Sequence, residues 1–95
     1  MIGVVATLKV KEGMSAEFEA AAKKLVEAVR ANEPDCLLYA LHGTDDPHTY
    51  VFMERYADEA ALENHRGTSH FKELGGAMGP FMAGRPDVQV MTEVQ

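Results

Sequence analysis

Hydrophobic residues change their spacing several times along this 95-residue chain, and the order of these changes constrains the fold more than any other feature. Four short apolar segments are typical of strands, namely residues 2–10, 36–43, 48–56 and 87–94. Between them, apolar residues recur at every third or fourth position in residues 15–33 and 58–67, which is typical of helices. The chain therefore alternates between the two patterns.

Residues with strong local preferences mark where these elements begin and end. Ser15 is expected to cap the first helix and Asp58 the second, because their side chains accept hydrogen bonds from the first helical N–H groups. A shorter helical piece follows, with Thr68 or Ser69 as its cap. The glycines and prolines of residues 75–86 are then expected to prevent a long regular element.

The order strand, helix, strand, strand, helix, strand predicts an α+β protein, a ferredoxin-like βαββαβ sandwich. Residues 44–47, Thr-Asp-Asp-Pro, are typical of a tight turn that joins the two middle strands into an antiparallel hairpin. The prediction is a four-stranded antiparallel sheet with the helices on one face. Since no repeat or linker interrupts the pattern, residues 1–95 are expected to form a single domain.

Two helices cover only one face of a four-stranded sheet, yet the middle strands are apolar on both faces. Every residue in 36–41 and in 50–53 is apolar, whichever face it points to. A sheet face open to water would carry polar residues at alternate positions. We therefore expect a second copy of the chain to cover the open face, which gives a homodimer. The alternative is that residues 75–86 shield it.

Composition argues against several classes of partner. The formal net charge of −6 leaves no basic footprint for nucleic acid or for an anionic membrane. No apolar run is long enough to span a bilayer, and the first residues lack the basic start of a signal peptide, so a cytoplasmic location is expected. The single cysteine, Cys36, lies beside Leu37 and Leu38, which predicts an inert buried thiol.

Residues 54–71, ERYADEAALENHRGTSHF, combine a glutamate at a strand end, an aromatic residue, a capping aspartate, a histidine on the apolar side of a helix and the run Ser-His-Phe. This pattern resembles the antibiotic biosynthesis monooxygenase family, also described as quinol monooxygenase-like proteins, and the order of elements on either side fits it too. The resemblance implies a dimeric α/β-barrel protein packed sheet against sheet. It also implies oxidation of an aromatic or quinol-like compound by O2 without metal, flavin or another cofactor.

His65 is the leading candidate for a general base, because an imidazole titrates near neutral pH. Its spacing from Ala61 and Leu62 directs it toward the sheet. The resemblance implies that a histidine at this position lines the substrate pocket. The alternative is a histidine at the edge of the core whose ring nitrogens are satisfied by backbone groups or by a carboxylate.

Glu54 is the second catalytic candidate, since it shares a strand face with Tyr50, Phe52 and Tyr56. Burial among aromatic rings raises the pKa of a carboxyl group that has no partner. In that setting Glu54 would act as an acid or a base, or orient a histidine. The alternative is an ion pair or a residue of the dimer contact.

Aromatic and flexible side chains near these two groups are expected to bind the substrate, namely His70, Phe71, Tyr50, Phe52, Tyr39 and Met78. The tyrosines would donate a hydrogen bond or stack on a ring, although tyrosines in strands are more often packing residues. No metal site is expected, because the four histidines lack the spacing of metal ligands.

The expected function is that of an enzyme, a cofactor-independent monooxygenase that oxidises a small aromatic or quinol-like molecule with O2. One alternative is an isomerase or processing enzyme for a small carbonyl or phosphorylated signalling molecule, which would need cations such as Arg55, Arg66 and Lys72 near the pocket. Another is a non-catalytic dimeric domain that binds a small ligand. Haem is not expected, because this chain has Gly75 where the similar haem-degrading enzymes carry an iron-binding histidine.

Overall fold

The predicted order of elements is confirmed in the computed structural model, which describes residues 1–94. The four strands form one antiparallel sheet in the order β2-β3-β1-β4, the arrangement of a ferredoxin-like fold. The elements in chain order are β1 (Ile2–Lys9), α1 (Ser15–Asn32), β2 (Cys36–Gly43), β3 (Thr49–Tyr56), α2 (Glu59–Gly67), α3 (Ser69–Ala77), the 3₁₀ turn η1 (Gly79–Phe81) and β4 (Asp87–Thr92).

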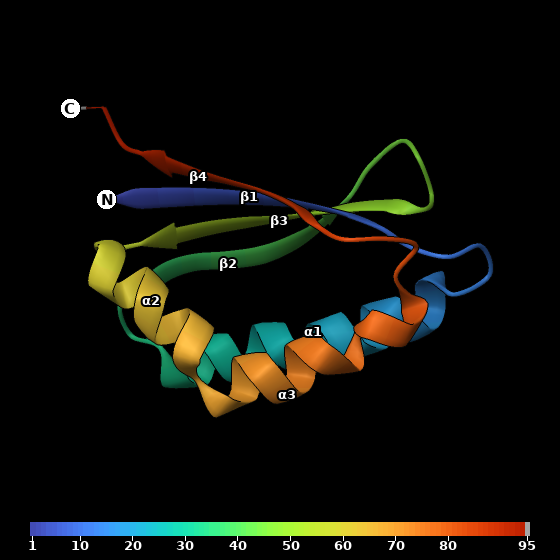
Figure 1. Ribbon diagram of the computed structural model, residues 1–95, viewed down its shortest axis with the longest axis horizontal. Coiled ribbons are helices and arrows are strands. Elements are labelled where there is room, and N and C mark those ends of the chain that lie inside the picture. Colours follow the sequence, from blue (N-terminus) through green and yellow to red (C-terminus); the bar gives the residue numbers. More distant parts are fainter. Residues whose placement is uncertain (95) are drawn as a thin grey trace.

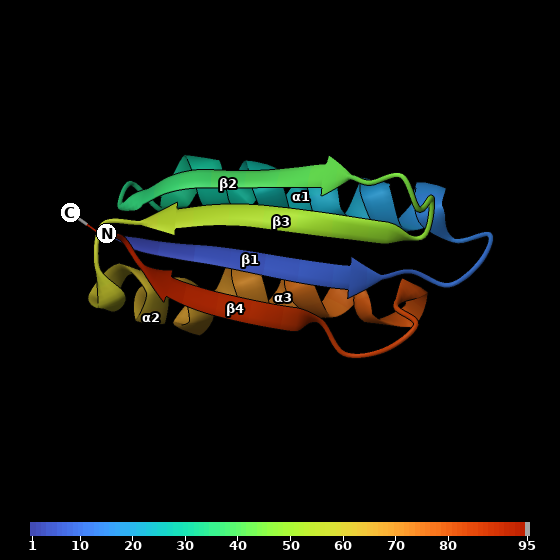
Figure 2. The same cartoon turned by 90° about the horizontal axis from the view of Figure 1, so that it is seen from above.

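The molecule has two layers, with the three α-helices on one face of the sheet, as the sequence predicts (Figures 1 and 2). Helix α1 lies behind β2 and β3, and α2 and α3 lie behind β1 and β4 (Figure 2). The α1 side chains that recur at helical spacing, Phe18, Leu25 and Val29, are fully buried against the sheet. Each such burial contributes roughly 1.5–3 kcal/mol relative to exposure in water.

Two of the three expected caps are confirmed. The Asp58 carboxylate accepts a hydrogen bond from the Ala61 N–H at 2.8 Å, and the Thr68 hydroxyl accepts one from the Phe71 N–H at 3.2 Å. The cap expected at Ser15 is wrong: the N-cap position is Met14, which makes no side-chain cap. The Ser15 hydroxyl instead donates to the Pro47 carbonyl at 3.2 Å, a partner that only the tertiary fold brings near.

The expectation that residues 75–86 form no long regular element is confirmed, because α3 ends at Ala77 and only the short turn η1 follows before β4. Helix α3 continues through Gly75 and Gly76 to Ala77, although each glycine costs about 1 kcal/mol in a helix interior. The physical reason is packing, because Phe71 and Leu74 on this helix pack against the hydrophobic core and Met78 at its C-cap is part of that core. Tertiary burial there outweighs local propensity. The remaining residues form η1 and the return to β4.

The other face of the sheet carries no helix within the described residues (Figure 2). Leu38, Met53 and Met91 lie on that face and are 44%, 43% and 44% exposed. Residues 75–86 therefore do not shield them. The uncovered apolar face agrees with the sequence pattern, and its coverage by a second copy stays a prediction.

Candidate functional site

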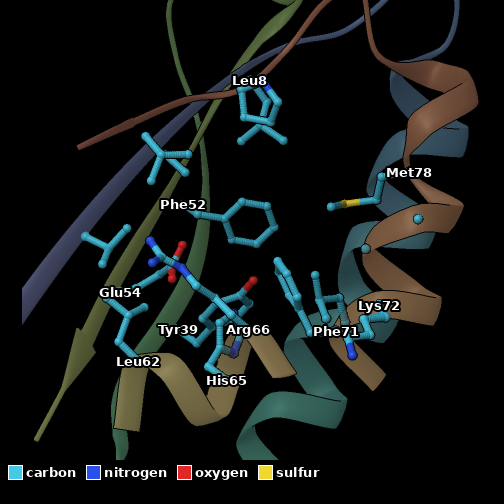
Figure 3. A pocket seen from close by; sticks show the side chains of 17 residues that line it. Leu8, Tyr39, Phe52, Glu54, Leu62, His65, Arg66, Phe71, Lys72 and Met78 are labelled. Carbon is cyan, nitrogen blue, oxygen red and sulfur yellow. The ribbon is translucent and has the colours of Figure 1, made fainter. Parts of the chain in front are cut away.

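A cavity of about 370 Å³ lies between the covered face of the sheet and helices α1, α2 and α3 (Figure 3). Its walls are mostly apolar, with Glu54, His65, Arg66 and Lys72 as the charged or titratable groups. The remaining lining residues are Val4, Ala6, Leu8, Leu25, Tyr39, Phe52, Leu62, Phe71, Gly75, Gly76, Met78, Pro86 and Val88. The volume suits a ligand of one or two rings.

The alternation of side chains along the strands determines which residues form the sheet side of this cavity. Phe52 and Glu54 stand two residues apart on β3 and so point to the same face, and Tyr39 pairs with Glu54 across the β2–β3 register. On β1, Val4 is the cross-strand partner of Glu54. A carboxyl group thus lies in an otherwise apolar row of side chains, as the sequence predicts (Figure 3).

Burial in this row raises the pKa of Glu54 to about 7. The Tyr56 hydroxyl, which donates to Glu54 Oε1 at 2.6 Å, and the nearby Arg66 both lower the pKa, and the Glu33 charge raises it. Burial is the largest of these effects. Glu54 is therefore a carboxyl group that can give or take a proton near neutral pH.

His65 is 2% exposed and is held by a carboxylate that the sequence interpretation did not single out. Its Nδ1 lies 2.9 and 3.0 Å from the two oxygens of Glu33, the residue at the C-cap of α1, which is 4% exposed. The Nε2 of His70 contacts the same carboxylate. One carboxylate at the end of α1 therefore binds a histidine from α2 and a histidine from α3.

The hydrogen bond to Glu33 determines which His65 nitrogen is free. Since a carboxylate only accepts, Nδ1 carries the proton and donates it to Glu33. Burial lowers the pKa of His65, an effect that Glu33 opposes in part. His65 is consequently neutral at pH 7, and its Nε2 has a lone pair with which to accept a proton.

Aromatic rings surround the His65 imidazole. Its centroid lies 4.5 Å from the ring of Phe71, 5.2 Å from that of Tyr39 and 5.4 Å from that of Tyr56. Burial raises the pKa of Tyr39 and of Tyr56, so both keep their protons, and the Tyr56 hydroxyl donates to Glu54. The packing leaves the imidazole little freedom to rotate.

Six of the eight residues expected in the site line the cavity, namely Glu54, His65, Phe71, Phe52, Tyr39 and Met78. The other two, His70 and Tyr50, do not. His70 is turned toward Glu33, and the Tyr50 hydroxyl donates to Glu19 at 2.5 Å beside α1. Tyr50 shares a strand face with Phe52, but its ring packs against Phe18 of α1, with the centroids 4.8 Å apart, while its cross-strand partner Leu8 lines the cavity.

Among the three cations considered in the sequence, Arg66 and Lys72 line the cavity, whereas Arg55 pairs with Glu93 elsewhere. Glu33 is the main residue that sequence reasoning missed. A weak signal was present, because an acidic residue at a helix C-terminus opposes the helix dipole and is therefore unusual without a cationic or hydrogen-bonding partner. Nothing in the spacing showed which histidines would supply that partner.

The remaining chemical groups add little to this site. Cys36 has a half-buried thiol whose pKa burial raises to about 11, which leaves it a poor nucleophile at neutral pH. Within residues 1–94, no three His, Cys, Asp or Glu side chains are grouped in a way that could hold a metal ion. Among the same residues, no helix is long and apolar enough to cross a membrane.

Comparison with known proteins assigns the family. The model of the antibiotic biosynthesis monooxygenase family matches residues 1–75. The chain belongs to this family. It is 35% identical over 72 residues to a Bacillus subtilis protein named "Putative monooxygenase YcnE", a match that covers 76% of each chain.

Two solved structures extend the similarity to the whole fold. The "putative antibiotic biosynthesis monooxygenase" of Caulobacter crescentus is 46% identical, with a TM-score of 0.93 over 99% of this chain and 90% of that one. Another antibiotic biosynthesis monooxygenase is 32% identical, with a TM-score of 0.91 over 100% of both chains. The family expected from residues 54–71 is therefore confirmed.

Proposed function

We propose that this protein is a monooxygenase that uses no cofactor and inserts one atom of O2 into a small aromatic or quinol-like molecule. The observation that carries the proposal is the orientation of His65. Its Nδ1 is engaged by the buried Glu33, which leaves Nε2 as the basic nitrogen of a residue that lines an apolar cavity. Membership of the monooxygenase family supports the class of reaction.

The proposed reaction starts with the transfer of a phenolic proton from the substrate to His65 Nε2. The resulting electron-rich anion gives one electron to O2, and the substrate radical and superoxide join to form a ring-carbon peroxide. The O–O bond then breaks as the proton on that carbon leaves. A hydroquinone and O2 become a hydroxyquinone and one water, so that atoms and electrons balance.

The cavity residues have definable parts in this reaction. The apolar walls exclude water and orient the ring, so that the anion and O2 meet in a fixed geometry. Glu54, with a pKa of about 7, is suited to protonate the departing hydroxide. Glu33 is proposed as a positioning residue that fixes the His65 tautomer and stabilises the imidazolium that forms when the base takes its proton.

We also propose that the protein works as a homodimer in which the uncovered sheet faces of two copies pack together. Leu38, Met53 and Met91 supply an exposed apolar surface on that face. A sheet of this size with one face open to water normally alternates apolar and polar residues, and this one does not. The helices and the cavity remain outside such an interface.

The test of the function is O2 uptake by the purified protein with a panel of hydroquinones and polyphenols, corrected for autoxidation. With ¹⁸O2, one labelled oxygen atom is expected in the product. His65→Ala should reduce the rate to that of the blank, whereas His48→Ala, at a partly exposed histidine in the loop before β3, should not. Rates equal to the blank across the panel, or no label in the product, would contradict the proposal.

A second candidate function is supported by the two cations that line the cavity. Arg66 and Lys72 are groups that an isomerase acting on a small phosphorylated carbonyl compound would need. The aromatic and apolar walls favour the first candidate, because a sugar-like phosphate offers few surfaces for them to contact. Binding of aromatic compounds without any turnover would instead indicate the non-catalytic ligand-binding domain.

A further inference from the structure

The cavity holds a feature that base-catalysed oxidation does not explain, namely a guanidinium beside its carboxyl group. Arg66 lies in the last turn of α2, one residue after His65, and lines the cavity. It is close enough to Glu54 to lower the pKa of that carboxyl, yet the two form no ion pair. Within residues 1–94, no other carboxylate pairs with Arg66 either.

Glu54 is a poor permanent partner for this guanidinium. Burial raises the pKa of Glu54 to about 7, so the carboxyl is protonated in about half of the molecules at that pH and offers Arg66 only a fraction of a charge. An anionic group on a bound molecule would meet the guanidinium without first displacing a fully charged carboxylate. Guanidinium and carboxylate also match in shape, because both are planar and can form two parallel hydrogen bonds.

The other cavity walls indicate the chemistry of the rest of the ligand. Tyr39, Phe52 and Phe71 supply aromatic rings, and Met78 supplies an adaptable thioether (Figure 3). Lys72 lies on the α3 side of the same cavity and, like Arg66, is exposed. Its ammonium is a point charge without the planar fork of a guanidinium, so it adds a positive potential rather than a two-point contact. Planar apolar walls with a cation at one side fit a flat ring that carries one acidic substituent.

We propose that the substrate is an aromatic carboxylate whose ring lies against the aromatic wall of the cavity and whose carboxylate is bound by Arg66. This inference rests on the proposed oxidation for the ring's hydroxyl groups, but the anion site itself is independent of turnover. In this arrangement the carboxylate is held beside His65 and Glu54. The position of the anion therefore fixes which ring hydroxyl faces the base.

The test is isothermal titration calorimetry with 2,5-dihydroxybenzoate and its methyl ester, which share a ring and differ in charge. At low salt the acid should bind the wild-type protein about two- to fivefold more tightly than the ester, the range expected for one exposed ion pair. Arg66→Gln should remove this preference, and Arg66→Lys should keep part of it. Lys72→Gln should lower the affinity less than Arg66→Gln.

Lys24→Gln is the matched control, because Lys24 is an exposed cation on α1 that does not line the cavity. Equal binding of acid and ester, or an acid preference that survives Arg66→Gln, would overturn the inference. Tighter binding of ribose 5-phosphate than of the acid would overturn it as well, in favour of a phosphate site. Lys24→Gln and Arg66→Gln each remove one positive charge from the protein. A preference for the acid over the ester that is lost only in Arg66→Gln therefore supports a direct contact between Arg66 and the carboxylate.

The two proposals can fail separately. If the acid is preferred and no compound consumes O2 above the blank, the anion site stands and the proposed oxidation is wrong. If O2 uptake depends on His65 while acid and ester bind equally, the oxidation stands and the inference about Arg66 is wrong. Binding and turnover are thus measured on the same purified protein by different readouts.

Discussion

Replacement of Glu33 tests both the stability and the chemistry that we attribute to its carboxylate. In the native protein the group is 4% exposed and accepts hydrogen bonds from His65 and His70. Glu33→Ala leaves two buried or half-buried imidazole N–H groups without a partner, which is expected to cost about 2–6 kcal/mol, at about 1–3 kcal/mol for each group. Glu33→Gln keeps one acceptor oxygen but no charge, for an expected cost of about 2 kcal/mol.

These costs are large for a chain of this size. A domain of 60–100 residues loses about 4–8 °C in Tm per kcal/mol, so Glu33→Gln should melt about 8–16 °C below the wild type. Urea unfolding followed by circular dichroism gives the corresponding free energy. Glu27→Gln is the control, since Glu27 is exposed on the same helix and has no hydrogen-bond partner among the described residues. Its midpoint should match that of the wild type.

Replacement of Glu33 should also change the pH dependence of stability and the tautomer of the His65 ring. The pKa of His65 is lowered in the folded state, so the unfolded chain binds the proton first as pH falls below about 6.5, and stability is lost there. Without the Glu33 charge the pKa of His65 falls further, and the loss between pH 7 and 5 becomes steeper. In Glu33→Ala, which removes the acceptor, the ¹⁵N shifts of the His65 ring should no longer show a single Nδ1–H tautomer. Unchanged stability together with unchanged ring shifts would refute the positioning role.

Three further predictions concern other parts of the molecule. Glu54→Gln should gain stability relative to the wild type as pH rises from about 4.5 to 7 and above. The reason is that the pKa of Glu54 is raised from 4.5 to about 7, and burial of the ionised carboxylate destabilises only the wild type. Urea midpoints at pH 5 and pH 8 measure this, and an equal difference between the two proteins at both pH values would contradict it. Gly76→Ala should stabilise the protein by about 0.5–1 kcal/mol, because Gly76 lies in α3 with no atom within 4 Å of an added Cβ. Thermal melting gives the sign of the change in stability, and a lower Tm would show that the glycine is needed. Met53→Glu should convert the proposed dimer into monomers, since it places a charge in the centre of the uncovered sheet face. Light scattering after gel filtration gives the mass of each protein. A wild-type protein that is already monomeric would exclude the interface.

Local patterns were sufficient to predict most of the fold. The alternation in β1 and the spacing of Phe18, Leu25 and Val29 each show a buried face without reference to any other element. The caps at Asp58 and Thr68 are equally local, because donor and acceptor lie three residues apart. Interactions over longer separations were not predictable in this way.

The candidate site shows which of its residues local sequence patterns could predict and which they could not. His65 and Glu54 were found because a titratable group on an apolar face is anomalous within its own element. Glu33 is 32 residues from His65 and 37 from His70, and only the packing of α1 against α2 and α3 brings them together. Tyr50 was misplaced for a related reason, since strand alternation gives the face of a residue but not which helix side chains pack on it, here Phe18 of α1.

The convergence on Glu33 also links the shape of the cavity to its chemistry. Helices α2 and α3 meet at Thr68, and each sends one histidine to the same carboxylate at the end of α1. That carboxylate therefore restrains the angle between the two helices that form one wall of the cavity. Because the same contact holds the proposed base in one tautomer, a change at Glu33 alters both the width of the cavity and the reactivity of His65. Activity lost in Glu33→Ala is therefore not evidence for the base alone, and Glu33→Gln, which keeps the shape of the side chain, separates the two effects.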